Sequence, residues 1–293
     1  MAKTKGPAAH FRVDHGKKFS LSDFDRAQTD GIDSKEDVED LLRKDLSRLS
    51  EMQEKLYAQN EWAVLIILQG MDAAGKDSLI KHVMSGLNPT GCEVSSFKAP
   101  STEELDHDYL WRTSKRLPER GKIGIFNRSY YEEVLVVRVH SELLENEKIP
   151  SSLVKKDIWQ QRFEDICSFE RYLGHNGVVV RKFFLHVSKQ EQKKRFLSRL
   201  NDPSKNWKFA AGDIKERERW DEYMKAYEKM IQQTATPDAP WYVVPADSKW
   251  FTHYVVASAL IETLEELKLD FPKVPKARRT ELESARRLLK RQS

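Results

Sequence analysis

The sequence predicts a three-layer α/β/α sandwich, with helices on both faces of a parallel five-stranded sheet and with a helical lid. Short apolar runs alternate with amphipathic segments of helical period, which is typical of a doubly wound parallel sheet. One run, residues 62–68, is apolar at every position, as expected for a central strand covered on both faces. A glycine-rich turn follows this run directly.

The other helices and strands are predicted from the spacing of apolar residues in the same way. From Ser34 to about Gln59, apolar residues recur at steps of three and four, which predicts one long helix. Ser34 with Asp37 three residues later is typical of a helix N-cap. Another helix is expected from Asp77 to about Leu87, after the glycine-rich turn. Further helices are expected at 153–173 and 213–233, and further strands at 94–97, 123–126, 178–187 and 241–244.

Composition limits the class of protein. The 293 residues are 39% hydrophobic and 33% charged, which suits a soluble globular chain, and a net charge of +4 does not by itself indicate nucleic-acid binding. Cys92 and Cys167 have no metal-ligand spacing and indicate free thiols in a reducing compartment. No apolar run approaches the roughly 20 residues that span a bilayer, and the first residues lack the apolar core of a secretion signal. We therefore expect a cytoplasmic protein with no membrane partner.

A phosphate-binding loop follows the central strand. Four residues separate Gly70 from Gly75, and Lys76 comes next, which is the G-x-x-x-x-G-K spacing of a P-loop. The loop amides form an anion-binding concavity, and the lysine reaches phosphates as a point charge. Asp77 replaces the usual Ser or Thr, so the hydroxyl that normally binds magnesium is missing. The loop is expected to bind phosphate or nucleotide through Gly70, Ala73, Ala74, Gly75, Lys76, Asp77 and Ser78.

Asp72 places a carboxylate inside this loop. A carboxylate beside a polyanion is repelled unless a cation accompanies it. Magnesium takes one or two carboxylates together with phosphate oxygens and waters, so Asp72 is a candidate metal ligand, or it positions the phosphoryl acceptor. The alternative is a local role in the turn or at the start of the helix.

A second group of polar residues ends the apolar strand that begins at Ile123. P-loop proteins typically carry a magnesium-binding Asp at this strand end, but here the residue is Asn127. Arg128 follows and can clamp a phosphoryl group bidentately. Glu132 or Glu133 can supply the missing carboxylate. We expect Asn127 and Arg128 to be catalytic residues and Glu132 to be a nucleotide and metal ligand.

A basic stretch begins near residue 189. Arg195 and Arg199 are four residues apart and share a helical face. Asn201-Asp202-Pro203 ends this helix, and Gly212-Asp213 starts the next one. Helix, basic loop and helix, over about residues 189–230, are typical of a kinase lid that closes over the site; a solvated basic helix is the alternative. The candidate lid residues are Arg195, Arg199, Lys205 and Lys208.

Three parts are therefore expected along the chain. Residues 1–33 are polar and form an irregular N-terminal arm. Residues 34–271 form a P-loop kinase-like domain that contains the lid. Residues 272–293 form a basic C-terminal segment, for which a solvated helix is favoured over a binding tail.

Three motifs carry a resemblance to a known family. They are Gly-Met-Asp-Ala-Ala-Gly-Lys-Asp, then Asn-Arg-Ser-Tyr-Tyr-Glu-Glu-Val-Leu-Val-Val-Arg-Val, then Asn-Trp-Lys-Phe followed by Trp-Asp-Glu-Tyr. In this order they resemble the polyphosphate kinase 2 family, over roughly residues 35–270. Members that favour diphosphates have Asp and Asn where this chain has Asn127 and Glu132. The chain is therefore most similar to the class III members, which phosphorylate AMP and ADP.

The resemblance implies a reversible phosphoryl transfer between inorganic polyphosphate and AMP, ADP or ATP, with guanine nucleotides as a further option. It implies Mg²⁺, or Mn²⁺ as an alternative, and a homodimer or homotetramer. It gives catalytic or phosphate-binding roles to Asp72, Lys76, Lys81, Arg112, Arg128, Arg138 and Arg195, with Arg199 as the alternative to Arg195.

Two other functions stay open on the sequence alone. An ATP-dependent nucleoside monophosphate kinase or small-molecule kinase also has a P-loop and a lid, although Asp72 and Asp77 argue against it. A regulator that binds nucleotides or polyanions is the third option. Because no zinc spacing and no known nucleic-acid module is present, no nucleic-acid partner is expected.

Overall fold

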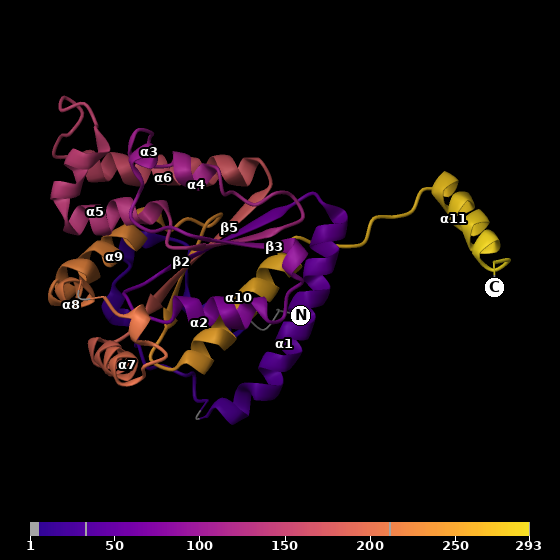
Figure 1. Cartoon of the computed structure of the whole chain (residues 1–293), viewed down its shortest axis with the longest axis horizontal. Helices are drawn as coiled ribbons and strands as arrows, with labels where there is room; N and C mark the ends of the chain where they lie inside the picture. The colour runs from indigo at the N-terminus through magenta and orange to yellow at the C-terminus, as the bar shows by residue number, and fades with distance from the viewer. Residues whose placement is uncertain (1–5, 33, 211, 293) are drawn as a thin grey trace.

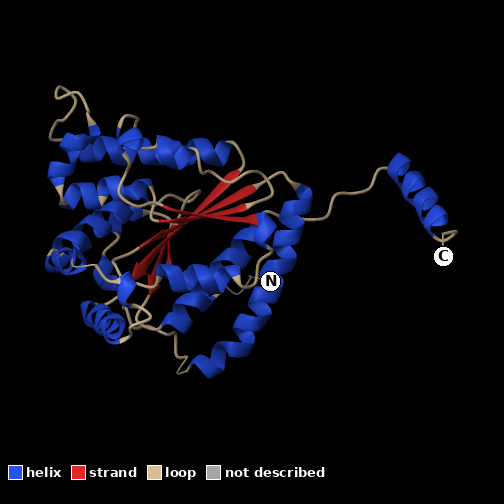
Figure 2. Ribbon diagram, viewed as in Figure 1, coloured by secondary structure: helices blue, strands red, loops and turns tan. Residues whose placement is uncertain are grey.

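A computed structural model describes residues 6–32, 34–210 and 212–292 of the chain. Positions 1–5, 33, 211 and 293 lie outside the described residues, so the predicted arm, lid and C-terminal segment are described over the rest of their lengths. A central sheet lies between two layers of helices (Figures 1 and 2). The predicted three-layer α/β/α architecture is confirmed.

The sheet has six strands in the order β1-β6-β5-β2-β4-β3. Five of them run parallel, as predicted, while β1 pairs with β6 in the antiparallel direction. β1 was not predicted, because two residues are too few to show the alternating pattern of a strand. β2 lies between β4 and β5, and all its residues are buried. The strands are β1 Arg12–Val13, β2 Ala63–Gln69, β3 Cys92–Ser96, β4 Ile123–Asn127, β5 Val178–His186 and β6 Trp241–Pro245.

One helical layer contains α1, α2 and α10, and the other contains α5, α6 and α9 (Figure 1). The predicted N-cap of α1 is present as a capping box between Ser34 and Asp37. The helices are α1 Lys35–Gln59, α2 Lys76–Met84, α3 Thr102–Leu105, α4 Trp111–Ser114, α5 Val136–Val139, α6 Ile158–His175, α7 Lys189–Asn201, α8 Gly212–Glu218, α9 Trp220–Thr234, α10 Lys249–Glu266 and α11 Lys276–Leu289.

Two predicted helices have different bounds in the structure. The helix expected over 213–233 is divided into α8 and α9, because Arg219 leaves helical geometry (φ −87°, ψ 20°) and its guanidinium contacts His140 at 2.9 Å. The helix expected from residue 153 begins at Ile158. Leu153 and Val154 are 56% and 43% exposed, so they bury too little surface to extend it.

The two chain ends differ in their packing. Residues 6–32 form three short 3-10 helices and β1, and Phe11 packs edge-on against Phe251 of α10, with ring centroids 5.9 Å apart. The helix α11 follows an extended linker and stands away from the main body (Figure 1). Within the described ranges, no helix is long and apolar enough to cross a membrane.

A buried ion pair links the sheet to the second helical layer. Lys182 of β5 is fully buried, and its Nζ donates to Glu170 of α6 at 2.6 Å. The hydroxyls of Tyr130 and Tyr131 also donate to Glu170, at 3.0 and 2.7 Å. These tyrosines closely follow Arg128, so the pair anchors the loop at the end of β4.

Replacing Lys182 with Met leaves the Glu170 carboxylate buried without its cation. We expect the free energy of unfolding to fall by about 3–5 kcal/mol, measured by urea denaturation. Glu51→Gln, which removes an exposed ion pair to Lys55 on α1, is the control and should leave the free energy of unfolding nearly unchanged. Similar losses in both variants would contradict a dominant role for the buried pair.

Candidate functional site

A groove of about 690 Å³ opens at the carboxyl ends of the parallel strands. This is the edge at which open α/β sheets bind ligands. Its walls come from the loop between β2 and α2, the end of β4, and α7 with the segment that follows it. The predicted site residues that line it are Asp72, Ala73, Ala74, Gly75, Lys76, Asp77, Ser78, Asn127, Arg128, Arg195, Arg199, Lys205 and Lys208.

The loop between β2 and α2 has the backbone of a phosphate cradle. Gly75 caps the N-terminus of α2 with φ +117°, a conformation that side-chain-bearing residues rarely adopt. Ala73 also has a positive φ, +61°. The amides at the start of α2 and the positive end of its dipole therefore face the groove.

The predicted lysine is folded back against its own loop. Lys76 is 9% exposed, and its Nζ donates to the carbonyl oxygens of Gly70 and Met71 at 2.6 and 3.3 Å. Burial, followed by repulsion from Arg128, lowers the pKa of Lys76 to about 8. The hydrogen-bond acceptors of Lys76 here are neutral carbonyls, so a phosphate bound in the groove would give it a negatively charged partner.

Arg128 joins the loop to the end of β4. Its Nη2 donates to Asp72 at 2.7 Å, and its Nη1 lies 3.4 Å from a Glu132 carboxylate oxygen. The charge of Glu132, the largest cause, together with that of Asp72 raises the pKa of Arg128 above its ordinary value. Arg128 itself has φ +66°, so the backbone is turned sharply to bring its side chain between the two acids. In the sequence, Asp72 belongs to one motif and Arg128 with Glu132 to another, and the fold brings the two motifs together.

Asp77, at the position of the usual hydroxyl, makes contacts that a Ser or Thr is too short to make. The amide of Asn127 donates to Asp77 Oδ1 at 3.0 Å, and Lys208 Nζ lies 3.9 Å from Asp77 Oδ2. Asp77 therefore connects the start of α2 to the end of β4 and to the segment after α7.

Arg195 is held by the backbone rather than pointing freely into the groove. Its side chain is 8% exposed, and Nη1 donates to the carbonyls of Ala73 and Ala74 at 3.0 and 2.7 Å. Nη2 donates to the carbonyls of Ala246 and Asp247 at 2.6 and 3.1 Å. Arg195 thus clamps the phosphate loop to the end of β6.

Five predicted binding residues do not line the groove: Gly70, Lys81, Arg112, Glu132 and Arg138. Lys81 is exposed on α2. Arg138 lies over the rings of Trp159 and Phe163 at 6.0 and 5.8 Å, and its Nη1 is buried without a hydrogen-bond partner among the described residues. Arg112 lines a neighbouring cavity instead.

The groove also contains cations that the sequence analysis did not select. Lys98 follows β3 and Lys249 follows β6, and both line the groove. Each comes shortly after a strand that ends at the same edge of the sheet. A search for basic residues after every predicted strand would have found both.

A second cavity, the side cavity, adjoins the groove. It has a volume of about 320 Å³, and much of its wall is apolar. Phe97, Lys98, Ala99 and Arg128 line both spaces, so the two adjoin each other at these residues. Glu132 lines the side cavity, while Asp72 lines the groove.

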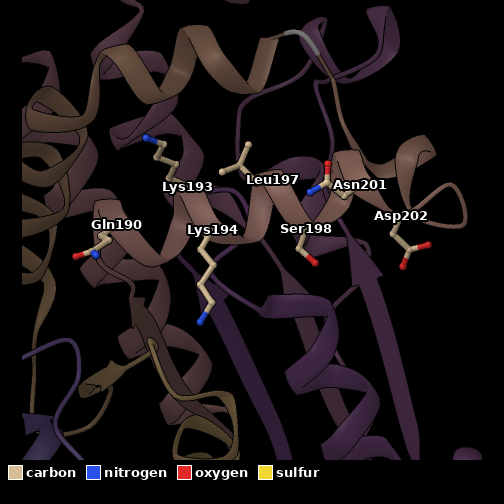
Figure 3. Close-up of a pocket in the computed structure, with 7 residues that line it drawn as sticks. All are labelled: Gln190, Lys193, Lys194, Leu197, Ser198, Asn201 and Asp202. Atoms are coloured by element: carbon tan, nitrogen blue, oxygen red, sulfur yellow. The ribbon is translucent and has the colours of Figure 1, made fainter.

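A shallow hollow lies along α7 (Figure 3). Its walls include Lys193 and Lys194, whose side chains point to opposite sides of the helix (Figure 3), but no residue of the phosphate loop. Ser198 lines both this hollow and the groove. The hollow therefore adjoins the groove at Ser198.

The acids in the groove suit a magnesium ion that arrives with phosphates. No cluster of three or more His, Cys, Asp or Glu side chains in the described part of the chain is placed to hold a metal. Magnesium commonly binds through one or two carboxylates, with phosphate oxygens and waters as the other ligands. Asp72 offers such a carboxylate at the phosphate loop.

A parallel sheet, a glycine-rich loop entering a helix, a buried lysine and a strand-end arginine define a P-loop phosphotransferase fold. The chain belongs to the family described as Polyphosphate kinase 2, whose model matches residues 32–272. It is 51% identical to the ADP-polyphosphate phosphotransferase of Rhodopseudomonas palustris, over 95% of this chain and 97% of that protein. It is 43% identical to the AMP/ADP-polyphosphate phosphotransferase of Meiothermus ruber, over 89% and 94% of the two chains.

A solved structure gives the same result. Polyphosphate Kinase 2 from Arthrobacter aurescens TC1 superimposes with a TM-score of 0.86 at 40% identity, covering 96% of this chain and 97% of that one. The family predicted from the three motifs is therefore confirmed.

Two arginines of α7 give separable outcomes when replaced. Arg195→Ala leaves four carbonyl oxygens without their donor, so we expect the free energy of unfolding to fall by about 2–3 kcal/mol. Arg199→Ala should change it by less than about 0.5 kcal/mol, and should raise the dissociation constant for tripolyphosphate about tenfold. Urea denaturation and calorimetric titration measure the two effects. Equal destabilisation by both substitutions would overturn the distinction.

The pKa of Lys76, lowered to about 8, predicts a pH dependence of anion binding. The lysine is charged below this pH and neutral above it, and only the charged form attracts phosphate. We expect the dissociation constant for tripolyphosphate to rise between pH 8 and 10, approaching about tenfold per pH unit. Lys76→Met, titrated over the same range, corrects for protons on the ligand. An identical pH profile in this variant would show that another group titrates.

Proposed function

We propose that this chain transfers a phosphoryl group reversibly between inorganic polyphosphate and a nucleotide, forming ATP from ADP and phosphorylating AMP as well. The names of the relatives from Rhodopseudomonas palustris and Meiothermus ruber support these substrates. Asn127 and Glu132, the residues that made the sequence most similar to class III members, support the inclusion of AMP.

The observation that carries the proposal is that the side cavity directly adjoins the groove and shares lining residues with it. A cationic groove around a phosphate loop suits a polyanion, and a partly apolar cavity beside it suits a nucleoside. Arg128 lies where the two spaces meet. A polyphosphate end on the loop and a nucleotide with its base in the side cavity would therefore bring their phosphates together beside Arg128.

In this arrangement the protein acts by positioning and by balancing charge. Lys76 and the loop amides hold the donor phosphates, and Arg128 faces the charge that develops on the transferred group. Lys205 and Lys208 line the groove from the lid and guide the rest of the polyphosphate. No strong general base is required, because the acceptor phosphate is already ionised near neutral pH.

Asp72 would hold Mg²⁺, or Mn²⁺ in its place, at the phosphate loop. Glu132 would contribute from the other side of Arg128. When bound, the ion neutralises phosphate charge. The protein's own part is to keep Asp72 oriented through Arg128, and to hold Asn127 against Asp77.

The remaining expectations are also proposals. A homodimer or homotetramer, a cytoplasmic location and acceptance of guanine nucleotides were predicted from the sequence and its family resemblance, and they stay predictions. The three-part division at residues 33 and 271 and the individual roles of the site residues are likewise predictions.

A donor exchange assay tests the proposal. We expect ATP to form from ADP with polyphosphate and magnesium, and expect ATP to be a poor donor to AMP by comparison. Asp72→Asn and Lys76→Ala should lower turnover by at least about a hundredfold, as expected for groups that act on charge in the transition state, while the circular dichroism spectrum stays unchanged. Lys44→Ala, an exposed lysine of α1 that does not line the groove, serves as the control. A clear preference for ATP as donor would favour the ATP-dependent kinase instead.

A further inference from the structure

Gln192 of α7 is a buried amide that makes hydrogen bonds to two different parts of the site. The residue is 1% exposed. Its Nε2 donates to the backbone carbonyl of Asp72 at 2.9 Å, and its Oε1 accepts from Nη1 of Arg217 on α8 at 2.7 Å. The transfer steps above use neither Gln192 nor Arg217. One side chain therefore joins the phosphate loop to the second helix of the lid.

The two partners of Gln192 require an amide at this position. A backbone carbonyl only accepts hydrogen bonds and a guanidinium only donates them, so the side chain between them must offer both a donor and an acceptor. A Met side chain of similar length could fill the same space without the cost of burying a polar group. A Glu side chain could pair with Arg217 but could not donate to Asp72. The amide therefore supplies a directed link in addition to packing.

At the loop end of the link, α7 holds the carbonyls of three consecutive residues. Gln192 binds the carbonyl of Asp72, and Arg195 binds those of Ala73 and Ala74. Gln192 and Arg195 are three residues apart and share a helical face. The carbonyl and the N–H of one trans peptide unit point in opposite directions. Fixing the Asp72 carbonyl therefore also fixes the direction of the Ala73 N–H, which belongs to the predicted anion cradle.

At the other end, Arg217 fixes α8 against its neighbours. Its Nη1 also donates to the carbonyl of Lys189 at 2.8 Å, and its guanidinium lies 6.0 Å from the ring centroid of Trp220. Asp213, one helical turn before Arg217, lines the groove. Burial, together with the charge of Asp72, raises the pKa of Asp213, so the two carboxylates lie near each other. The position of α8 therefore affects the charge around the phosphate loop.

We infer that Gln192 is a positioning residue for phosphoryl transfer, which couples the placement of α8 to the phosphate loop. An anion bound by the loop then stabilises α8 through Gln192 and Arg217. Gln192 acts through the backbone of Asp72 and through Arg217, and it touches no reacting atom. The inference rests on the proposed function, since it concerns how the same groove is assembled for the transfer.

Hydrogen–deuterium exchange of the α8 amides tests the coupling. The exchange rate is measured with and without saturating tripolyphosphate, and without divalent cations, so that no cation bridges the ligand to Asp213. In the wild-type chain we expect tripolyphosphate to slow exchange in α8 by about fivefold or more, because a coupled element opens less often when the loop is occupied. Exchange in α11, which stands away from the main body (Figure 1), should not change.

Two variants break the link at different places. Gln192→Met removes both hydrogen bonds, whereas Arg217→Met removes only the α8 end. We expect each to reduce the slowing to below about twofold when tripolyphosphate again saturates the site, and the double variant to be no worse than either single one, as expected for residues that act together. Gln190→Met, at an exposed position of the same helix, should keep the wild-type effect.

Kinetics separate positioning from a purely structural role. With polyphosphate and ADP, we expect Gln192→Met to lower kcat about tenfold and to change KM for ADP by less than about twofold, because small displacements of aligned groups reduce the rate more than they reduce binding. The stoichiometry of tripolyphosphate binding in calorimetry counts the folded sites, and kcat is referred to that number. A purely structural role would leave kcat per folded site at the wild-type value.

Three results would overturn the inference. One is exchange in wild-type α8 that does not respond to tripolyphosphate, which needs no variant to establish. Another is a wild-type response that persists in Gln192→Met, and the third is an unchanged kcat per folded site in that variant. All of them differ from failure of the proposed function, in which the wild-type chain makes no ATP from ADP and polyphosphate, because the exchange measurement requires no turnover.

Discussion

The contact between Arg128 and Asp72, at 2.7 Å, holds the two halves of the site together. Asp72 belongs to the loop after β2 and Arg128 to the end of β4; these strands are neighbours in the sheet, and the ion pair fixes how the two side chains face each other. The same guanidinium reaches Glu132 on the side-cavity wall. Phosphate groups that enter the groove compete for this cation. The pair of acids therefore keeps Arg128 in place until the substrate takes over part of its charge.

The architecture and the loop were predictable because they rest on local patterns. A fully apolar strand, a glycine spacing and a lysine occur within about fifteen residues of one another, and their geometry follows from the backbone alone. The role of Arg195 was harder to predict. Its partners, the carbonyls of Ala73 and Ala246, lie far away in the sequence and carry no side-chain signal. The spacing predicted that Arg195 is a cation of the lid. In the fold, its guanidinium instead binds backbone carbonyl oxygens.

The side cavity could not be predicted from the sequence either, because the residues that form it are far apart along the chain. Glu133 and Glu147 line it and pair with Arg162 of α6, and these three side chains come from separate segments of the chain. Arg112 entered the sequence analysis only through the family resemblance, as a phosphate ligand. Its contact with the carbonyl of Lys98 and its proximity to Glu133 place it beside the carboxylates instead. Burial of opposite charges together becomes apparent only when the chain is folded.

The anchoring of Arg195 also limits how the region over the groove can move. The first half of α7 is attached to the phosphate loop and to the end of β6 by the four bonds of this side chain. At the other end, α9 packs into the core through Tyr223 and Tyr227. Between them, Lys208 lies 3.9 Å from Asp77, and Arg217 of α8 donates to the carbonyl of Lys189 at 2.8 Å. A rotation of α7 and α9 together as one rigid body would break these contacts.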